Sequence, residues 1–398
     1  MKTFFEFQRS MVSEGANEMS EWIKLLLYKE NPSVYDVIDF DDDRIYQDSL
    51  LFSFFNNDID RLPLDSILLP YMNIKEKRTF KITTDQLGRF YFNKYGWLKT
   101  DQPNRDLEIT YADDRISLND NIEYSFEKPH YVADGIELVR YSLPTMKKFF
   151  FDVDGNVVDV EIDNVCNKFS DKLSRAIALI KQCTPEHYSL IRSTVDRFLI
   201  FNVDTYLRNS FATLSAQGAA FFNAYQTDYD EVHFIDDIAH QTGHIIFNCI
   251  SYNKSAFFNI DGETVVQEIG TNDEIHERRT LYIVLHALYT YHCIFTCLSA
   301  CLDANVFTSK QQHEALGRIK FYLVKFGMDL EVVGKFNDEH KIQNGVFTEI
   351  GAYFISEMAN SYMVAYNKYN GLVKSLNMDD QPYNFTCSIF RKMNPQYV

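Results

Sequence analysis

The chain has 398 residues, a length that suits two domains better than one. Hydrophobic residues make up 46% of it, with 33 Phe and 25 Tyr, which is enough apolar surface for a large core and excludes disorder as its main state. Its 39 Lys and Arg stand against 56 Asp and Glu, a net charge of −17, which argues against binding to nucleic acid or to an anionic membrane.

The N-terminal stretch, the most apolar stretch and the cysteines all predict a cytoplasmic protein. The N-terminal stretch is interrupted by Glu6, Gln8 and Arg9 before it reaches the length of a signal peptide. The most apolar stretch, 281–302, is interrupted by His286 and His292, so no membrane-spanning helix is predicted. The seven cysteines are an odd number without paired CxxC motifs, which indicates reduced thiols.

The first part of the chain is predicted to be rich in strands after an opening helix. Apolar residues at i, i+3 and i+4 spacing predict a helix within 11–30. From about 75 to 162 the period shortens towards two, with Asp, Asn, Gly and Pro clusters between the apolar runs. Three runs in this region are predicted strands: 79–83, 89–92 and 107–111. Residues 149–158 predict a hairpin that turns at Asp154-Gly155.

After residue 164 the pattern becomes mainly helical. Helices are predicted at 169–183 and 186–201, with Pro185 placed to open the second. Two short strand-like pieces follow, at 211–214 and 220–222. Longer helices are then predicted at 231–252, 280–302, 309–328 and 347–370. We therefore expect an α+β protein, with a β-rich N-terminal part, 1–165, and a mostly helical, metal-binding C-terminal domain, 166–398.

The sequence around His240 carries the clearest chemical motif. His240 and His244 are four residues apart, so both imidazoles lie on one helix face and can reach one metal ion. A coincidental pair of histidines is the alternative, but the apolar residues around them indicate a half-buried helix, where imidazoles need partners. Gln241 stands where a zinc peptidase has the Glu that activates water, which argues against peptidase chemistry and not against metal binding.

The segment that leads to His286 offers a third ligand. If a helix begins near Thr280, Arg279 and His286 are seven residues apart and fall on one face at about 100° per residue. A 2-oxoacid bound to iron needs a cation for its distal carboxylate, and Arg279 or Arg278 could supply it. The alternative stays open that both arginines are solvated residues at a helix start and that His286 belongs to the core.

Residues 206–329 resemble the HExxH-type peptide-modification family, the 2-oxoglutarate- and Fe(II)-dependent peptide β-hydroxylases of ribosomal peptide natural-product pathways. The matching pieces are 210–215, 218–223, the helix with His240 and His244, an Arg-containing linker into 284–289, and a long helix at 309–328. The resemblance implies non-haem Fe(II), 2-oxoglutarate and O₂, and a peptide substrate with a leader segment.

Carried over by residue, the resemblance makes His240 and His244 the motif histidines and His286 the third metal ligand. It places Arg279 or Arg278, with Tyr282 nearby, where the keto acid is held. Gln241 replaces the family's Glu at the candidate catalytic position. An iron oxygenase draws its oxidising power from the metal and not from a carboxylate base, so Gln241 is either tolerated or marks an inactive member.

The leading expectation is thus an oxygenase that hydroxylates a side-chain carbon, by resemblance the β-carbon, of a ribosomally made peptide. The β-rich part would dock that peptide by strand addition. The alternatives are a degenerate, non-catalytic metal-binding or peptide-binding scaffold and a zinc hydrolase, which Gln241 disfavours. Cys293, Cys297 and Cys301 repeat every four residues; we expect small thiols packed on one helix face, sensitive to oxidation.

Overall fold

The structure is a computed structural model that describes residues 3–58, 61–73, 77–112, 115–118, 122–271, 274–340 and 345–395. Strands gather in the N-terminal half and helices in the C-terminal half, which confirms a mixed α+β protein. The chain packs as two compact units. Unit 1 comprises Met1–Gly15, Phe169–Thr194 and Gln226–Val398, and unit 2 comprises Ala16–Lys168 and Val195–Tyr225.

Unit 2 contains helices near its start and three small sheets. The helix α1 (Phe4–Glu30) begins in unit 1 and ends in unit 2, where α2 (Asp43–Tyr46), α3 (Ser49–Phe55), α4 (Leu64–Leu68) and α5 (Pro144–Lys147) follow. One antiparallel sheet has the order β1 (Arg78–Thr83), β4 (Asp106–Ala112), β5 (Arg115–Leu118). Another has the order β2 (Arg89–Phe92), β3 (Gly96–Thr100), β6 (Tyr124–Glu127).

The largest sheet of unit 2 is built around a strand that comes late in the sequence. Its order is β10 (Phe211–Ala212), β11 (Ala219–Asn223), β9 (Arg197–Phe201), β8 (Ile136–Val139), β7 (His130–Ala133). The central strand β9 is parallel to both neighbours and buried along its whole length. Arg197 is buried too, and its guanidinium donates to Asp48 at 2.7 Å and to Asn93 at 2.6 Å, so its charge is compensated inside the core.

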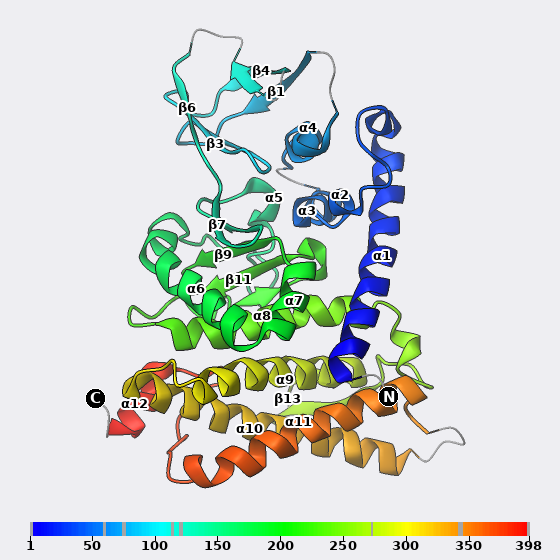
Figure 1. Cartoon of the computed structure of the whole chain (residues 1–398), viewed down its shortest axis with the longest axis vertical. Helices are drawn as coiled ribbons and strands as arrows, with labels where there is room; N and C mark the ends of the chain where they lie inside the picture. Colours follow the sequence, from blue (N-terminus) through cyan, green and yellow to red (C-terminus); the bar gives the residue numbers. More distant parts are fainter. Residues whose placement is uncertain are drawn as a thin grey trace. The chain divides into compact units, whose positions relative to one another are not determined.

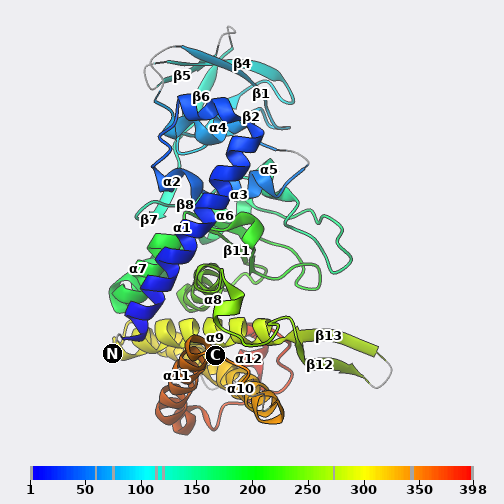
Figure 2. The same ribbon diagram turned by 90° about the vertical axis from the view of Figure 1, so that its right-hand side faces the viewer.

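Unit 1 is mainly helical. Its elements are α6 (Asp163–Cys183), which begins in unit 2, α7 (Pro185–Thr194), α8 (Glu231–Ile250), the strands β12 (Val265–Thr271) and β13 (Glu274–Thr280), α9 (Leu281–Asp303), α10 (Ser309–Glu339), α11 (Glu349–Val373) and α12 (Cys387–Met393). Helix α9 packs against α8, α10 and α11 (Figure 1). The antiparallel β12–β13 hairpin extends beyond the ends of these helices (Figure 2).

Most predicted elements are present, and two differ from the prediction. The predicted helix at 186–201 ends at Thr194, and Arg197–Phe201 form β9 instead. This run is apolar on both sides because a central parallel strand is buried on both faces, so its pattern resembles that of a buried helix. The predicted hairpin at 149–158 is reduced to a single bridge between Phe151 and Val157.

The predicted boundary at residue 165 lies close to one crossing between the units and misses the others. The chain passes from unit 2 to unit 1 after Lys168, but it also changes unit after Gly15, Thr194 and Tyr225. The division into 1–165 and 166–398 therefore stays a prediction. In the structure, each unit is built from segments that alternate along the chain.

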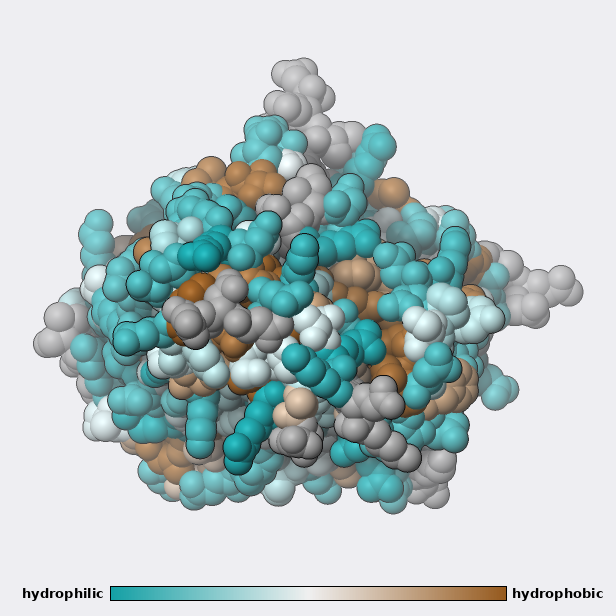
Figure 3. Space-filling view, turned by 90° about the horizontal axis from the view of Figure 1, so that it is seen from above, coloured by the Kyte–Doolittle hydropathy of each residue, from teal (hydrophilic) through white to brown (hydrophobic). Residues whose placement is uncertain are grey.

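Within the described residues, α9 is long and apolar enough to cross a membrane by composition alone, and 67% of its most apolar window is buried inside the protein. Burial of this kind is what the core helix of a soluble protein shows. Hydrophilic side chains cover much of the face drawn in Figure 3, with hydrophobic areas between them. The cytoplasmic location stays a prediction.

Candidate functional site

Helix α8 presents His240 and His244 on one side, as the spacing predicts. The helix begins at Asp230, whose side chain accepts a hydrogen bond from the Val232 N–H at 2.9 Å and caps the first turn. The two imidazole rings have centroids 5.0 Å apart, and both side chains are half-buried. They are thus neighbours on one side of α8.

His286 joins them from α9. Thr280 caps that helix by accepting from the Ile283 N–H, so the predicted helix start near Thr280 is confirmed. His286 Nε2 lies 2.8 Å from His244 Nδ1, a direct hydrogen bond between the two rings. The structure therefore brings the three histidines predicted as metal ligands into one cluster, His240–His244–His286, which we call the histidine cluster.

Close packing of α8 on α9 makes this meeting possible. A Cβ on Gly243 would lie 3.3 Å from the Cys293 Sγ and 3.4 Å from the Thr290 Cα, which is tighter than ordinary contact. A larger residue at position 243 would require the Cys293 thiol or Thr290 to give way by a few tenths of an ångström. Glycine next to His244 is therefore part of what positions the cluster.

Burial keeps the histidines of the cluster neutral. It lowers the pKa of His244 to about 4, and it lowers the pKa of His240 and His286 well below the ordinary value, helped by the neighbouring imidazoles. Neutral imidazole is the form that binds a metal. In the His244–His286 bond, however, one ring nitrogen donates and the other accepts, so that one lone pair is already used.

The cluster is not arranged as a finished metal site. Among the residues that the structure describes, no group of three or more His, Cys, Asp or Glu side chains is placed to hold a metal ion. Two nitrogens bound at right angles to one metal at about 2.1 Å lie about 3 Å apart, close to the 2.8 Å seen here. Rotation of the rings and a change of tautomer, which moves the shared proton to the other nitrogen of its ring, would be needed before the cluster could chelate.

Aromatic side chains surround the cluster. The Phe247 ring has its centroid 4.7 Å from that of His286, and the Tyr322 ring lies edge-on to His240 at 6.3 Å. The predicted cofactor residue Tyr282 is here too, with its ring centroid 5.7 Å from His286. Its hydroxyl shares a hydrogen bond of 3.0 Å with the Ser251 hydroxyl, and the Lys254 Nζ lies 4.0 Å from its ring centroid.

Gln241, the candidate catalytic residue, is hydrogen-bonded along its own helix. Its Nε2 donates to the Asp237 Oδ1 at 3.1 Å, and its Oε1 is buried without a hydrogen-bond partner in the described part of the chain. The other Asp237 oxygen lies 3.9 Å from the Nε2 of His233. The Asp237 carboxylate thus lies between His233 and Gln241 on α8.

Arg278 and Arg279 lie on the strand β13 and not on the helix, so the prediction that Arg279 shares a helix face with His286 is wrong. Arg279 is buried and holds both Asp329 oxygens, at 2.6 Å and 2.9 Å, and the Gln267 Oε1 at 3.0 Å. The hydrogen bonds to the Asp329 carboxylate raise the pKa of Arg279. Arg278 is exposed and pairs with Glu268 at 3.1 Å.

The sequence contained no pattern that could have identified Asp329. It comes 50 residues after Arg279, on the long helix α10, and nothing local marks it as an ion-pair partner. This ion pair affects the predicted cofactor site directly. The guanidinium of Arg279 already binds the Asp329 carboxylate, so it has no net charge left to bind the carboxylate of a cosubstrate. In this structure Arg279, the predicted binding residue for the keto acid, is therefore occupied by Asp329.

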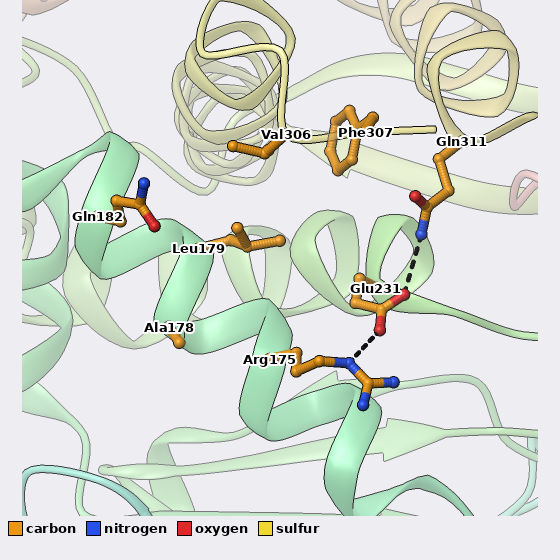
Figure 4. A pocket seen from close by; sticks show the side chains of 8 residues that line it. All are labelled: Arg175, Ala178, Leu179, Gln182, Glu231, Val306, Phe307 and Gln311. Carbon is orange, nitrogen blue, oxygen red and sulfur yellow. Dashed lines mark hydrogen bonds and ion pairs between the residues drawn. The ribbon is translucent and has the colours of Figure 1, made fainter. Parts of the chain in front are cut away.

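A separate cavity of about 370 Å³ lies in unit 1 at the beginning of α8 (Figure 4). Its walls are Arg175, Ala178, Leu179, Gln182, Glu231, Val306, Phe307 and Gln311. Glu231 is bound on both sides, by Arg175 and by the Gln311 amide at 2.9 Å. None of its walls belongs to the predicted site, so the cavity and the histidine cluster are distinct features.

No family model matches the chain, and no curated protein matches it. The resemblance of residues 206–329 to the peptide β-hydroxylases therefore rests on the motifs alone.

Proposed function

We propose that the chain is an Fe(II)- and 2-oxoglutarate-dependent oxygenase that hydroxylates a side-chain carbon of a ribosomally made peptide. The observation that carries this proposal is the histidine cluster, in which three neutral imidazoles from α8 and α9 meet beside aromatic rings. The i, i+4 spacing predicted His240 and His244 as ligands, and the resemblance added His286. All three residues belong to the histidine cluster.

The chemistry of the donors fits a divalent transition metal. Three neutral imidazoles suit iron and zinc equally, and half-burial leaves a side open to a cosubstrate. His240, His244 and His286 would hold the ion. Iron together with 2-oxoglutarate and O₂ supplies the oxidising power that hydroxylation of an unactivated carbon requires. Phe247 and Tyr322 would keep water from the bound groups, and Gly243 would hold the helices at the required separation.

The cosubstrate fits less simply. Arg279 can bind the distal carboxylate of 2-oxoglutarate only if Asp329 releases it, since both oxygens of Asp329 occupy the guanidinium now. Lys254 lies beside Tyr282 and next to the cluster, but it is paired with Glu263 at 2.6 Å. For the peptide, the net charge of −17 favours basic stretches.

A non-catalytic scaffold is the second candidate, and two observations favour it. His244 and His286 satisfy each other, and Arg279 is neutralised by Asp329, so neither pair requires a ligand. Gln241 is a neutral amide that is bound to Asp237, so the base that a zinc hydrolase would need is missing at that position. The hydrolase is thus the weakest of the three alternatives.

The test is the anaerobic addition of Fe(II) and then 2-oxoglutarate to the purified full chain, followed by visible absorption. We expect a charge-transfer band that needs both additions and is lost in His240→Ala and His286→Ala. His340→Ala is the matched control, because His340 is an exposed histidine at the end of α10. A folded protein that binds neither iron nor 2-oxoglutarate would leave the scaffold as the function, while zinc bound at one equivalent would indicate a structural metal.

A further inference from the structure

The second half of α1 leaves an apolar stripe uncovered. One side of the helix is buried through Met19, Ile23 and Leu27, which follow one another at i, i+4 and i+8. The other side presents four large apolar side chains that are each at least 40% exposed: Trp22, Leu25, Leu26 and Tyr28. Single exposed apolar residues are common, but four within two turns of one helix mark an interaction surface.

Phe40 extends this stripe beyond the helix. Its exposed ring lies 4.9 Å from the Lys24 Nζ and 5.5 Å, between ring centroids, from Tyr35. The Tyr35 ring lies 6.2 Å from that of Tyr28, and its hydroxyl donates to the Lys24 carbonyl oxygen at 2.7 Å. The five exposed residues, all in unit 2, form what we call the α1 patch: Trp22, Leu25, Leu26, Tyr28 and Phe40.

Acidic side chains surround the α1 patch. Residues 16–43 contain eight Asp or Glu and two Lys, a net charge of −6. Glu18 lies one turn before Trp22 on the exposed side of α1, and Asp39 and Asp41 flank Phe40. All three carboxylates are exposed, whereas one of the two lysines is already held by two carboxylates, at 2.8 Å and 2.9 Å. The rim of the patch is therefore negative.

An apolar stripe inside a negative rim fits an occupant of opposite charge. A second copy of the chain would bring the same carboxylates against the patch, and an anionic membrane would bring phosphates, so both meet like charge. We propose that the α1 patch is a docking surface for a basic amphipathic helix of a partner protein or peptide. Its apolar residues at i, i+3, i+4 and i+7 cover the stripe, and its Lys and Arg side chains pair with Glu18, Asp39 and Asp41. This surface is independent of the histidine cluster and of the proposed oxygenase.

Trp22 reports directly on occupation of the patch. The chain has two tryptophans, and the other one, Trp97, is 3% exposed, so a partner that covers the patch shifts the fluorescence of Trp22 to the blue. The probe is a synthetic peptide of about 18 residues with leucines on one helix face and lysines elsewhere, long enough to form a helix. We expect a saturable blue shift with this peptide, none in Trp22→Phe, and none with the same peptide carrying glutamates in place of lysines.

Leu25→Glu separates docking from simple charge attraction. Leu25 lies between Trp22 and Tyr28 on the helix surface, and the substitution adds a negative charge. Attraction by charge alone would strengthen, whereas docking should weaken by at least about tenfold, because an apolar contact is lost. The matched control is Leu87→Glu, a leucine of unit 2 that is 65% exposed, beside 68% for Leu25, and lies outside the patch. It should leave the affinity unchanged.

The double variant Glu18→Gln/Asp41→Asn tests the rim. It changes only exposed polar groups, so folding should tolerate it, and it should weaken binding by about threefold at low salt and flatten the salt dependence. Equal binding to Leu25→Glu and Leu87→Glu, or equal binding of the lysine and glutamate peptides, would overturn the proposal. So would a blue shift with phosphatidylglycerol vesicles, or a dimer in sedimentation that Leu25→Glu abolishes, since the occupant would then be a membrane or a second copy.

Discussion

Arg278 and Arg279 are neighbours in the sequence and have opposite surroundings. The Arg278 side chain is 65% exposed and pairs with an exposed Glu268, so water screens the interaction. The Arg279 side chain is 10% exposed, and Asp329 is 5% exposed, so both charges depend on each other inside the protein. The pair of arginines therefore offers an internal comparison between a surface and a buried ion pair.

Arg279→Ala should lower the free energy of unfolding by about 3–5 kcal/mol, because it leaves the buried Asp329 carboxylate without its cation. Arg278→Ala should change it by less than about 1 kcal/mol. Urea unfolding followed by near-ultraviolet circular dichroism measures both. If Arg279→Ala and Arg278→Ala lowered the free energy of unfolding equally, the buried Arg279–Asp329 pair would be no more important for stability than the exposed pair of Arg278 with Glu268.

Of the residues in the candidate site, the sequence could predict those whose neighbours lie on the same element. Helical spacing was enough to place His240 and His244 together, since both lie on one element. The segment around His286 offered it as a third ligand and the resemblance assigned it that role, but its position beside His244 depends on how α9 packs against α8. The partner of Arg279 could not be predicted, because a pair between β13 and α10 depends on tertiary packing and leaves no local pattern.

At the scale of elements, glycines mark where helices approach most closely. A Cβ on Gly15 of α1 would lie 1.9 Å from the carbonyl oxygen of Cys249, a backbone atom at the end of α8 that cannot move aside. Gly334 of α10 has no atom within 4 Å of such a Cβ. Both glycines are inside helices, so only their surroundings differ.

Gly15→Ala should destabilise the protein by about 1–3 kcal/mol or more, because α1 must shift away from α8. Gly334→Ala should stabilise it by up to about 1 kcal/mol, since alanine is the better helix former and meets no clash. Thermal unfolding of both variants beside the wild type is the measurement. A neutral or stabilising Gly15→Ala would contradict the close packing of α1 on α8.

Periodicity predicted the helices better than it predicted the sheet. Helices α8, α9 and α11 begin and end within a few residues of their predicted bounds, because each has a polar cap and a long apolar stripe. The strand β9 was missed because Arg197–Phe201 is buried on both faces and follows a helix directly. A short apolar run of this kind has no period that separates strand from helix.

At the scale of the whole molecule, unit 2 takes its central strand, β9, from beyond the predicted N-terminal region 1–165. The strand β9 pairs with β8 on one side and β11 on the other, and its Arg197 neutralises the buried Asp48. A fragment of residues 1–165, the N-terminal region predicted from the sequence, lacks β9 and leaves β8 with an open edge. It would also leave Asp48 buried without its cation.

We therefore expect the fragment 1–165 to lack cooperative unfolding and the fragment 16–225 to show it. The longer fragment contains every residue of unit 2 and restores β9 beside β8. Each fragment would be unfolded in urea while near-ultraviolet circular dichroism reports packing of the aromatic core. Arg197→Ala in the fragment 16–225 is the control, since it should remove most of the stability while leaving the chain length unchanged. Cooperative unfolding of 1–165 would mean that β9 is not needed to close the core, and the division near residue 165 would then describe the folding units better than the interleaved one.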